Sequence, residues 1–328
     1  INIKESNNDS TTFVTLDKLF NKYSILDFNK STKIGNKAIE LAKEKKDSKE
    51  LISWYGKMSN MYMDYELYSL ALDYIKLAMK THQKRKGKIK WWLINIGNVY
   101  YAEEMYEDAQ SYYFDALNSF NQSENKSDTI GIAVTYLNLA MVYEKIKKID
   151  SATFYYHKSM QVCDLIHDYY RKTNAGLHLS NMYLSLNNFD SAEFYLKIAE
   201  EYNRLSTEQD LLHTIREKEG DYYAKIGEYE KALNYYDLSV KIASSFNDTR
   251  NLLKIYDKKA KVYTLLRQMD LAITNYKFAI KEAQKINNIK RLVAINKLIS
   301  ELYFYKLNID SAYHFFGNTL TGKILLMI

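Results

Sequence analysis

Residues 131–165 read GIAVTYLNLAMVYEKIKKIDSATFYYHKSMQVCDL, and this stretch contains the pattern that decides the fold. Its first half predicts an amphipathic helix, because apolar side chains recur at helical spacing (Ile132, Tyr136, Leu139, Val142 and Tyr143). A short polar turn at 147–149 follows. The second half predicts another helix with one apolar face (Ala152, Tyr155, Tyr156 and Met160). The stretch therefore predicts a pair of antiparallel helices.

The same arrangement recurs along the chain in a fixed register: a small residue, a tyrosine three positions later, and an alanine nine positions after the tyrosine. The seven triplets are Ser59/Tyr62/Ala71, Gly97/Tyr100/Ala109, Ala140/Tyr143/Ala152, Ser180/Tyr183/Ala192, Gly220/Tyr223/Ala232, Ala260/Tyr263/Ala272 and Ser300/Tyr303/Ala312. Successive small residues lie 38, 43, 40, 40, 40 and 40 positions apart. Repetition at this period indicates a solenoid of stacked helix pairs. We expect the small residues to lie where two helices cross closely and the tyrosine to fill the groove beside the crossing.

A second repeated position lies two residues before each register alanine. It holds Ser69, Glu107, Asp150, Asp190, Glu230, Asp270 and Asp310. Serine and aspartate accept hydrogen bonds from the first amides of a helix, and carboxylates favour the positive end of the helix dipole. We therefore expect these residues to cap the second helix of each pair.

The pattern resembles the tetratricopeptide repeat family. Repeat two carries the residues of the family motif most fully (Leu93, Ile96, Gly97, Tyr100, Ala109, Tyr113 and Ala116). The period of 40 exceeds the usual unit of about 34 residues, so the chain is similar to the long-unit branch of the family, and it has no proline to close each unit. The resemblance implies an all-α, right-handed superhelical solenoid of seven antiparallel helix pairs with a degenerate repeat capping the N-terminal end.

This interpretation predicts four segments. Residues 1–12 form a flexible segment, 13–47 a degenerate capping repeat, 48–320 the seven repeats, and 321–328 either a C-terminal cap or a truncated membrane segment. Because the chain starts at Ile1 rather than methionine, we expect a leading segment to have been removed or left out. We expect membrane contact only through a segment outside this chain, and the sequence leaves the compartment open, cytoplasmic or extracytoplasmic.

The composition favours binding over catalysis. The chain has 31 tyrosines, a formal net charge of +6 and a single cysteine, Cys163, so no intrachain disulfide can form. The six histidines lack paired metal-ligand spacing, and there is no phosphate-binding glycine loop or nucleophile motif. We expect no enzymatic activity, no metal and no cofactor. The basic stretch Lys80–Lys90 is interpreted as a solvated loop, with nucleic-acid or anionic-surface binding as the alternative.

The family resemblance implies that the first helix of each pair lines a concave groove. In the first four repeats the groove positions hold Asn60, Asn95, Asn98, Asn138, His178 and Asn181, flanked by Trp91 and Tyr101. An asparagine amide both donates and accepts, so a row of them suits the backbone of an extended peptide. The alternative is that these amides are simply solvated on an exposed helix face.

The groove positions of repeats five and six are charged instead. They include Lys218, Lys254 and Lys258, interleaved with Glu217, Asp221 and Asp257. Asn181, Lys254 and Lys258 match part of the carboxylate clamp of chaperone-binding family members, whereas Leu177 and Lys218 depart from it. Because the interleaved carboxylates would repel a ligand carboxylate, we expect ion pairs among these side chains rather than a clamp.

The sequence therefore predicts a scaffold that binds a protein or peptide in its groove. A more specific form of this hypothesis is the sensor or interaction part of a larger, signalling bacterial regulator. The alternatives are an assembly scaffold that uses its outer or end surfaces, and an anionic-surface or nucleic-acid binder through residues 80–90. The identity of the partner is not encoded in any motif of the chain.

Overall fold

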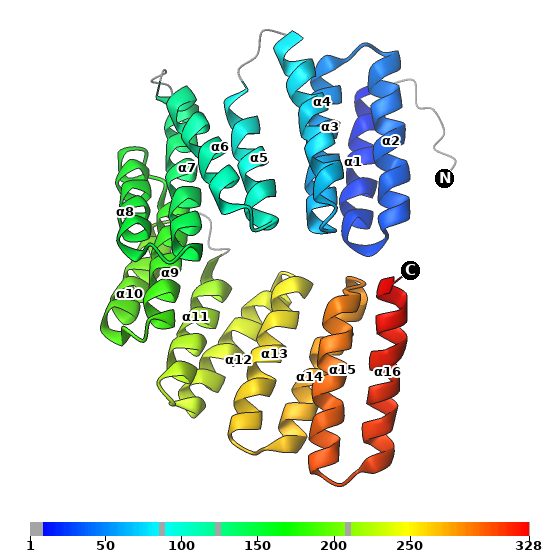
Figure 1. The fold of residues 1–328 in the computed structure, drawn as a ribbon, viewed down its shortest axis with the longest axis vertical. Coiled ribbons are helices and arrows are strands. Elements are labelled where there is room, and N and C mark those ends of the chain that lie inside the picture. The colour runs from blue at the N-terminus through cyan, green and yellow to red at the C-terminus, as the bar shows by residue number, and fades with distance from the viewer. Residues whose placement is uncertain (1–8, 85–88, 122–125, 207–210, 328) are drawn as a thin grey trace. The chain divides into compact units, whose positions relative to one another are not determined.

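The computed structural model describes residues 9–84, 89–121, 126–206 and 211–327, and within these ranges every regular element is a helix (Figure 1). The chain divides into two compact units, residues 1–171 and 172–328. The first unit contains α1 (Asp9–Leu26), α2 (Phe28–Glu44), α3 (Ser48–Asp64), α4 (Tyr68–Lys84), α5 (Lys90–Ala102), α6 (Tyr106–Phe120), α7 (Lys126–Lys145) and α8 (Ile149–Leu165).

The second unit contains nearly all of α9 (Tyr169–Ser185), followed by α10 (Phe189–Leu205), α11 (Leu212–Lys225), α12 (Tyr229–Ser245), α13 (Thr249–Leu265), α14 (Met269–Lys285), α15 (Ile289–Tyr305) and α16 (Ile309–Met327). Within each unit, sequential helices pack as antiparallel pairs, and each pair stacks on the next (Figure 1). The predicted all-α solenoid of helix pairs is confirmed.

One turn, repeated seven times, explains why nine residues separate the register tyrosine from the alanine. In repeat three the carbonyl of Tyr143 accepts a hydrogen bond from the amide of Lys148 at 2.9 Å, and the carbonyl of Lys148 accepts one from the amide of Ala152 at 3.0 Å. The first bond is the six-to-one bond of a Schellman motif, which ends the first helix. The second starts the next helix, so the tyrosine and the alanine mark the two sides of one turn.

The equivalent six-to-one bonds of the other repeats are 2.8–3.0 Å long (Leu67 to Tyr62, Met105 to Tyr100, Asn188 to Tyr183, Glu228 to Tyr223, Gln268 to Tyr263 and Asn308 to Tyr303). Each turn places one residue in the left-handed region, at φ of 57–86° (Glu66, Glu104, Lys147, Asn187, Gly227, Arg267 and Leu307). This conformation favours glycine, because a Cβ crowds the following carbonyl. Gly227 meets that preference and Asn187 tolerates the conformation, so the other five turns contain a strained residue.

The register tyrosine also stacks on an aromatic ring 12 residues later, on the second helix of the same pair. The pairs are Tyr62/Tyr74, Tyr100/Tyr112, Tyr143/Tyr155, Tyr183/Tyr195, Tyr223/Tyr235 and Tyr303/Phe315, with ring centroids 5.2–5.6 Å apart. Such offset stacking is a favoured arrangement of aromatic rings. Repeat six is the exception, because Asn275 occupies the position that would stack on Tyr263.

The predicted capping residues lie two positions too late. Asp150 belongs to the first turn of α8, whose N-cap is Lys148, and the same holds for Asp190, Glu230 and Asp270 in α10, α12 and α14. The prediction was wrong because the Schellman turn fixes the N-cap at the residue after the left-handed one. The carboxylates still favour the helix dipole from the first turn.

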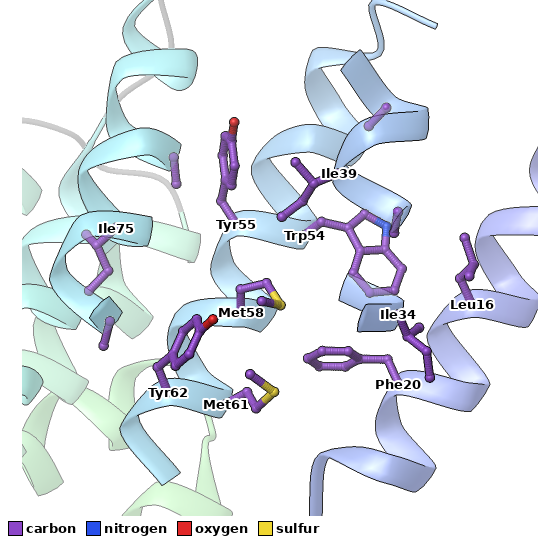
Figure 2. Close-up of a cluster of buried hydrophobic side chains, with 14 of the residues drawn as sticks. Leu16, Phe20, Ile34, Ile39, Trp54, Tyr55, Met58, Met61, Tyr62 and Ile75 are labelled. Carbon is purple, nitrogen blue, oxygen red and sulfur yellow. The ribbon is translucent and has the colours of Figure 1, made fainter. Parts of the chain in front are cut away.

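The leading pair α1–α2 packs on α3 through a dense apolar core (Figure 2). The rings of Phe20 and Trp54 meet edge to face with centroids 5.5 Å apart. Gly35 on α2 lets Met58 pack closely there, because a Cβ at that position would lie 2.1 Å from the sulfur of Met58 and would force this side chain to shift. The first pair is thus joined to the repeats by the same close helix crossing that the small register residues provide elsewhere.

The structure gives the local conformation in parts of three of these segments. Helix α1 begins at Asp9, inside the segment expected to be flexible, while residues 1–8 lie outside the described residues. The stretch 80–90 is not one solvated loop: Lys80 lies in α4, residues 85–88 are outside the described ranges, and Lys90 is buried. Helix α16 extends through the terminal segment to Met327. Among the described residues, no helix is both long and apolar enough to cross a membrane.

Candidate functional site

Two of the predicted groove asparagines in the first unit bond to each other across neighbouring repeats. The Nδ2 of Asn138 on α7 donates to the Oδ1 of Asn98 on α5 at 3.0 Å. Asn98 follows the small register residue of its repeat by one, and Asn138 precedes that of the next repeat by two. Both side chains are half-buried, so they combine a fixed geometry with access to solvent.

A buried tyrosine holds Asn98 from the other side. The hydroxyl of Tyr113 on α6 donates to the same Oδ1 at 2.8 Å. The ring of Tyr113 packs against Gly97, where a Cβ would lie 2.5 Å from its Cε1 atom, and burial raises the pKa of the Tyr113 hydroxyl. The Oδ1 of Asn98 therefore accepts two hydrogen bonds. Within the described part of the chain, the Nδ2 of Asn98 and the Oδ1 of Asn138 have no partner.

Tyr101 lies beside a tyrosine–carboxylate contact. The hydroxyl of Tyr156 donates to the Oε2 of Glu144 at 2.6 Å. Burial, together with the nearby charge of Glu144, raises the pKa of Tyr101 to about 12. Tyr101 also packs edge to face on Tyr106 with ring centroids 5.7 Å apart. This predicted groove residue is thus a neutral, half-buried phenol at neutral pH.

The remaining predicted residues of the first unit are more dispersed. Trp91 is 38% exposed and packs edge to face on Phe120 at 5.3 Å, next to an ion pair of 3.0 Å between Lys90 and Asp128. Asn95 is half-buried and Asn60 is exposed. The structure places neither asparagine within bonding distance of another described side chain.

In the second unit, the register positions of Asn98 and Asn138 are held by Asp221 and Lys258, which belong to a charged network. The Nζ of Lys258 on α13 lies 2.6 Å from the Oδ2 of Asp221 on α11, and it also pairs with Glu217. The hydroxyl of Tyr236 on α12 donates to the Oδ1 of Asp221 at 2.8 Å. Although burial alone would lower the pKa of Lys258, the charges of Asp221 and Glu217 outweigh it and raise that pKa. Lys258 is therefore a permanently charged side chain.

Lys218 joins this network to Asn181. Its Nζ lies 3.2 Å from the Oδ1 of Asn181 on α9 and 3.6 Å from the Oδ2 of Asp221. The contacts Asn138 to Asn98, Lys218 to Asn181 and Lys258 to Asp221 all join a residue two before one small register residue to the residue one after the preceding one. The register therefore places one such polar contact between first helices in the first unit and two in the second.

Asp221 lies at the centre of this network, whereas the sequence pattern indicates only a charge that opposes a clamp. It contacts Lys218, Lys258 and Tyr236. Its register position could have identified it, because Asp221 stands where Asn98 stands in repeat two, and each accepts from the tyrosine 15 residues later. The position holds the amide in the first unit and the carboxylate in the second.

The expected ion pairs are present in place of a clamp. Lys258 is neutralised by two carboxylates, and Asp257 is paired with Arg291 at 2.5 Å and with Lys261 at 2.8 Å. Lys254 is exposed and makes no ion pair with another described residue. Of the three residues that match the clamp, only Lys254 is therefore an uncommitted charge.

His178 on α9 is half-buried near Lys218. Burial, reinforced by the positive charge of Lys218, lowers the pKa of His178 from 6.5 to about 4. The imidazole is therefore neutral at physiological pH. It can serve as a donor or an acceptor but not as a cation.

A hollow of about 480 Å³ in the first unit was not expected from the sequence. It is lined by residues of α1 and α3, among them Phe13, Trp54 and the ion-paired Asp17 and Lys57. The Nε1 atom of Trp54 is buried and has no hydrogen-bond partner in the described structure. The Lys57 ammonium lies over the Trp54 ring, 4.8 Å from its centroid.

Neither a metal centre nor an activated thiol is found among the described residues. No group of three His, Cys, Asp or Glu side chains there could hold a metal ion. Cys163 is buried, and this burial raises the pKa of its thiol to about 12. A thiol in that state is a packing residue and not a nucleophile.

Two tetratricopeptide repeat family models match the sequence, one over residues 88–164 and the other over residues 216–246. The first matched segment contains Asn98, Tyr113 and Asn138, and the second contains Asp221 and Tyr236. This chain belongs to the tetratricopeptide repeat family. The same turn and the same register of small residue, tyrosine and alanine also occur in the repeats outside the matched segments. No curated protein matches the sequence significantly.

Solved structures show the same fold at low identity. Aspartyl phosphate phosphatase F from Bacillus subtilis has a TM-score of 0.61 and 13% identity, over 98% of this chain and 85% of that one. The Rap conjugation gene regulator of the plasmid pLS20, solved in complex with a peptide, has a TM-score of 0.57 and 18% identity, over 87% of this chain and 77% of that one. A signal transduction ATPase with a tetratricopeptide repeat sensor, from Pyrococcus horikoshii, has a TM-score of 0.59 and 18% identity, over 95% of this chain and 46% of that one.

Proposed function

We propose that this tetratricopeptide repeat protein binds an extended protein segment along the face that the first helices of the repeats form within a unit. The face is polar, half-buried and built from side chains that the second helices hold in place. It therefore has the pre-organisation that reduces the entropic cost of binding.

The Asn98–Asn138 pair is the observation that carries the proposal. Tyr113 and the mutual bond fix both amides, and they leave one donor (Asn98 Nδ2) and one acceptor (Asn138 Oδ1) uncommitted among the described residues. A peptide group presents one acceptor and one donor of its own. The pair can thus grip backbone without reading side chains.

For the second unit, taken by itself, we propose that an extended segment is bound there with selectivity by charge. Lys258, Asp221 and Glu217 satisfy one another, whereas Lys254 on the same helix as Lys258 remains exposed. An acidic side chain of the bound segment would pair with Lys254. It would not pair with Lys258, because separating Lys258 from its carboxylates would cost free energy. The expected partner is therefore an extended segment with an acidic residue.

Two of the similar structures support a regulatory role of this kind. One is a gene regulator bound to a peptide, and the other contains a tetratricopeptide repeat sensor. We propose that the present chain is the sensing or interacting part of a regulator. We also propose that it acts by binding and not by catalysis, although one similar structure is a phosphatase. Purified chain should release no phosphate from acetyl phosphate above the buffer rate, and a turnover would contradict this proposal.

The binding proposal is tested with a random peptide display library as the probe. Peptides selected on the wild-type chain should lose at least tenfold in affinity for the double variant Asn98→Ala, Asn138→Ala in fluorescence anisotropy. The matched control is Asn118→Ala, which removes an exposed amide from α6 in the same unit. Peptides that bind the double variant and the wild type equally, with both folded by circular dichroism, would overturn the role of this pair.

A further inference from the structure

The hollow of about 480 Å³ between α1 and α3 lies on the first-helix face of the first unit. Two of its lining residues hold register positions of the groove. Lys57 precedes the small register residue by two, as Asn138 does in repeat three. Ser53 precedes it by six, as Trp91 does in repeat two. The face that the proposed function assigns to an extended segment therefore contains this hollow.

The floor of the hollow is apolar and is held by the core. Phe13 of α1 and Trp54 of α3 line it and are 8% and 1% exposed. Trp54 reaches from α3 to α1, where its ring meets Phe20 edge to face (Figure 2). Val14, which is 51% exposed, adds an apolar side chain to the lining. Because the core fixes the floor, the hollow is preformed, and its volume lies in the range of ligand pockets.

The rim of the hollow carries an excess of negative charge. It contains three carboxylates and two ammonium groups (Asp17, Asp47, Glu50, Lys45 and Lys57). Lys57 and Asp17 neutralise each other, and the same ammonium covers the Trp54 ring at 4.8 Å from its centroid. The remaining charge favours a cationic ligand. No group of three described His, Cys, Asp or Glu side chains is placed to hold a metal ion, so an organic cation fits better.

Two of the rim carboxylates can accept further hydrogen bonds. Asp47 caps α3 with its Oδ1, which accepts from the amides of Lys49 at 2.9 Å and Glu50 at 3.1 Å, and no described donor bonds to its Oδ2. A glutamate at the position of Glu50 often accepts from the amide of the N-cap residue. Here that amide of Asp47 bonds to the carbonyl of Ala42 at 2.9 Å instead. Glu50 is half-buried and forms no ion pair with another described residue.

An arginine side chain fits this combination of groups. Its guanidinium carries donors in a planar fork that can bond two carboxylates, and its methylene stem can pack on Phe13 and Val14. A lysine would bring a single point charge. An apolar side chain would remove water from Glu50 without replacing its hydrogen bonds. An anionic group would meet the excess of carboxylates.

We propose that the hollow between α1 and α3 binds an arginine side chain of the extended segment, with the guanidinium on Glu50 and Asp47. This inference rests on the proposed function and adds to it. Within the first unit, the Asn98–Asn138 pair grips backbone and reads no side chain, whereas the hollow selects one side chain by its charge and length. The partner of this unit is therefore an extended segment with an arginine.

The first test uses those selected peptides whose binding depends on the Asn98–Asn138 pair. They should contain an arginine, and replacing it with citrulline, which is neutral and of nearly the same shape, should lower the affinity at least about tenfold in fluorescence anisotropy. Glu50→Gln should cause a similar loss, and citrulline should then cause little more, because both changes remove one contact. The matched control Glu40→Gln, at an exposed carboxylate of α2 outside the hollow, should change nothing.

This test separates the inference from the proposed function. Peptides that need the Asn98–Asn138 pair but bind equally well with citrulline would overturn the arginine site and leave the proposed function in place. Peptides that need arginine but lose nothing on Glu50→Gln would also overturn the site, because their arginine would bind elsewhere.

A small probe tests the hollow without any bound segment. A chain labelled with fluorotryptophan has three tryptophan signals in fluorine NMR, and Trp54→Phe identifies the one from the hollow. Acetyl-arginine methylamide should shift the Trp54 signal, and the citrulline analogue should not. Ser53→Lys places a competing cation at an exposed lining position and should abolish the shift. No shift with the arginine probe, or equal shifts with both probes, would overturn the proposal even if no peptide were selected.

Discussion

Tyr143 and Tyr155 stack with ring centroids 5.2 Å apart and planes 3° from parallel, which joins the last turn of one helix to the first turns of the next. The same ring pair recurs at a separation of 12 residues in five other repeats. The stack and the six-to-one backbone bond act on the same tyrosine. In these six repeats the helix pair is therefore held together by one residue in two ways.

Replacing one ring of the stack should lower stability beyond the loss of apolar area. Stacked aromatic pairs contribute about 0.5–1.5 kcal/mol beyond burial, so Tyr155→Leu should reduce the free energy of unfolding by about 1–2 kcal/mol in urea titration. Leu165→Ala, at a side chain 77% exposed on the same helix, is the control and should change it by less than about 0.5 kcal/mol. Equal losses in the two variants would contradict a specific role for the stack.

The left-handed turn residues predict substitutions that stabilise the chain. Arg267 has φ of 59°, and a left-handed residue with a Cβ costs roughly 1–2 kcal/mol. Arg267→Gly should therefore raise the melting temperature, despite the greater backbone entropy that glycine loses on folding. Gly227→Ala, at φ of 86°, should lower it by a comparable amount. Arg267→Ala is the matched control, because it removes the side chain without relieving the turn, and it should leave the melting temperature nearly unchanged.

The sequence predicted the helix pairs well because the register tyrosine and alanine have fixed roles in one turn. It misplaced the caps, since Asp150 and its equivalents look like good N-caps, and only the backbone geometry of Lys148 shows where the helix begins. It also did not predict that Asp221 both accepts a hydrogen bond from Tyr236 and pairs with Lys258. A pattern of residue types assigns Asp221 to a helix face, but its partners come from neighbouring helices, and their reach depends on packing.

Only some of the predicted groove residues contact one another, again because side-chain contacts depend on packing. Asn98 and Asn138 were placed on one face by register, and they do bond to each other. Asn60 and Lys254 occupy comparable positions yet are exposed, because the side chains that could reach them differ from repeat to repeat. Periodicity therefore predicts where a side chain emerges, while its bonding depends on non-repeated neighbours.

Removing the cation of the second-unit network should destabilise the chain strongly. Lys258→Met leaves the buried Glu217 and its neighbour Asp221 without their shared counter-ion. Breaking a buried pair by removing one partner typically costs about 3–5 kcal/mol, which chemical denaturation would measure. The double variant Lys258→Met, Glu217→Gln should recover part of the loss, because it also removes one uncompensated charge. A Lys258→Met variant as stable as the wild type would mean that the network is hydrated and weak.

The neutral His178 predicts a decline in stability in mild acid. Its pKa is about 4 in the folded chain and 6.5 unperturbed, so between these values the unfolded chain binds a proton that the folded chain excludes. The stabilising effect is complete above pH 6.5 and is lost as the pH falls towards 4. Between pH 7 and pH 5 the loss should be about 2 kcal/mol, and His178→Gln should remove this part of the pH dependence. The matched variant His314→Gln, at an exposed histidine of α16, should keep the wild-type slope. Urea titrations of the three proteins at both pH values measure the difference, and identical slopes for wild type and His178→Gln would show that the imidazole is solvated in the folded chain.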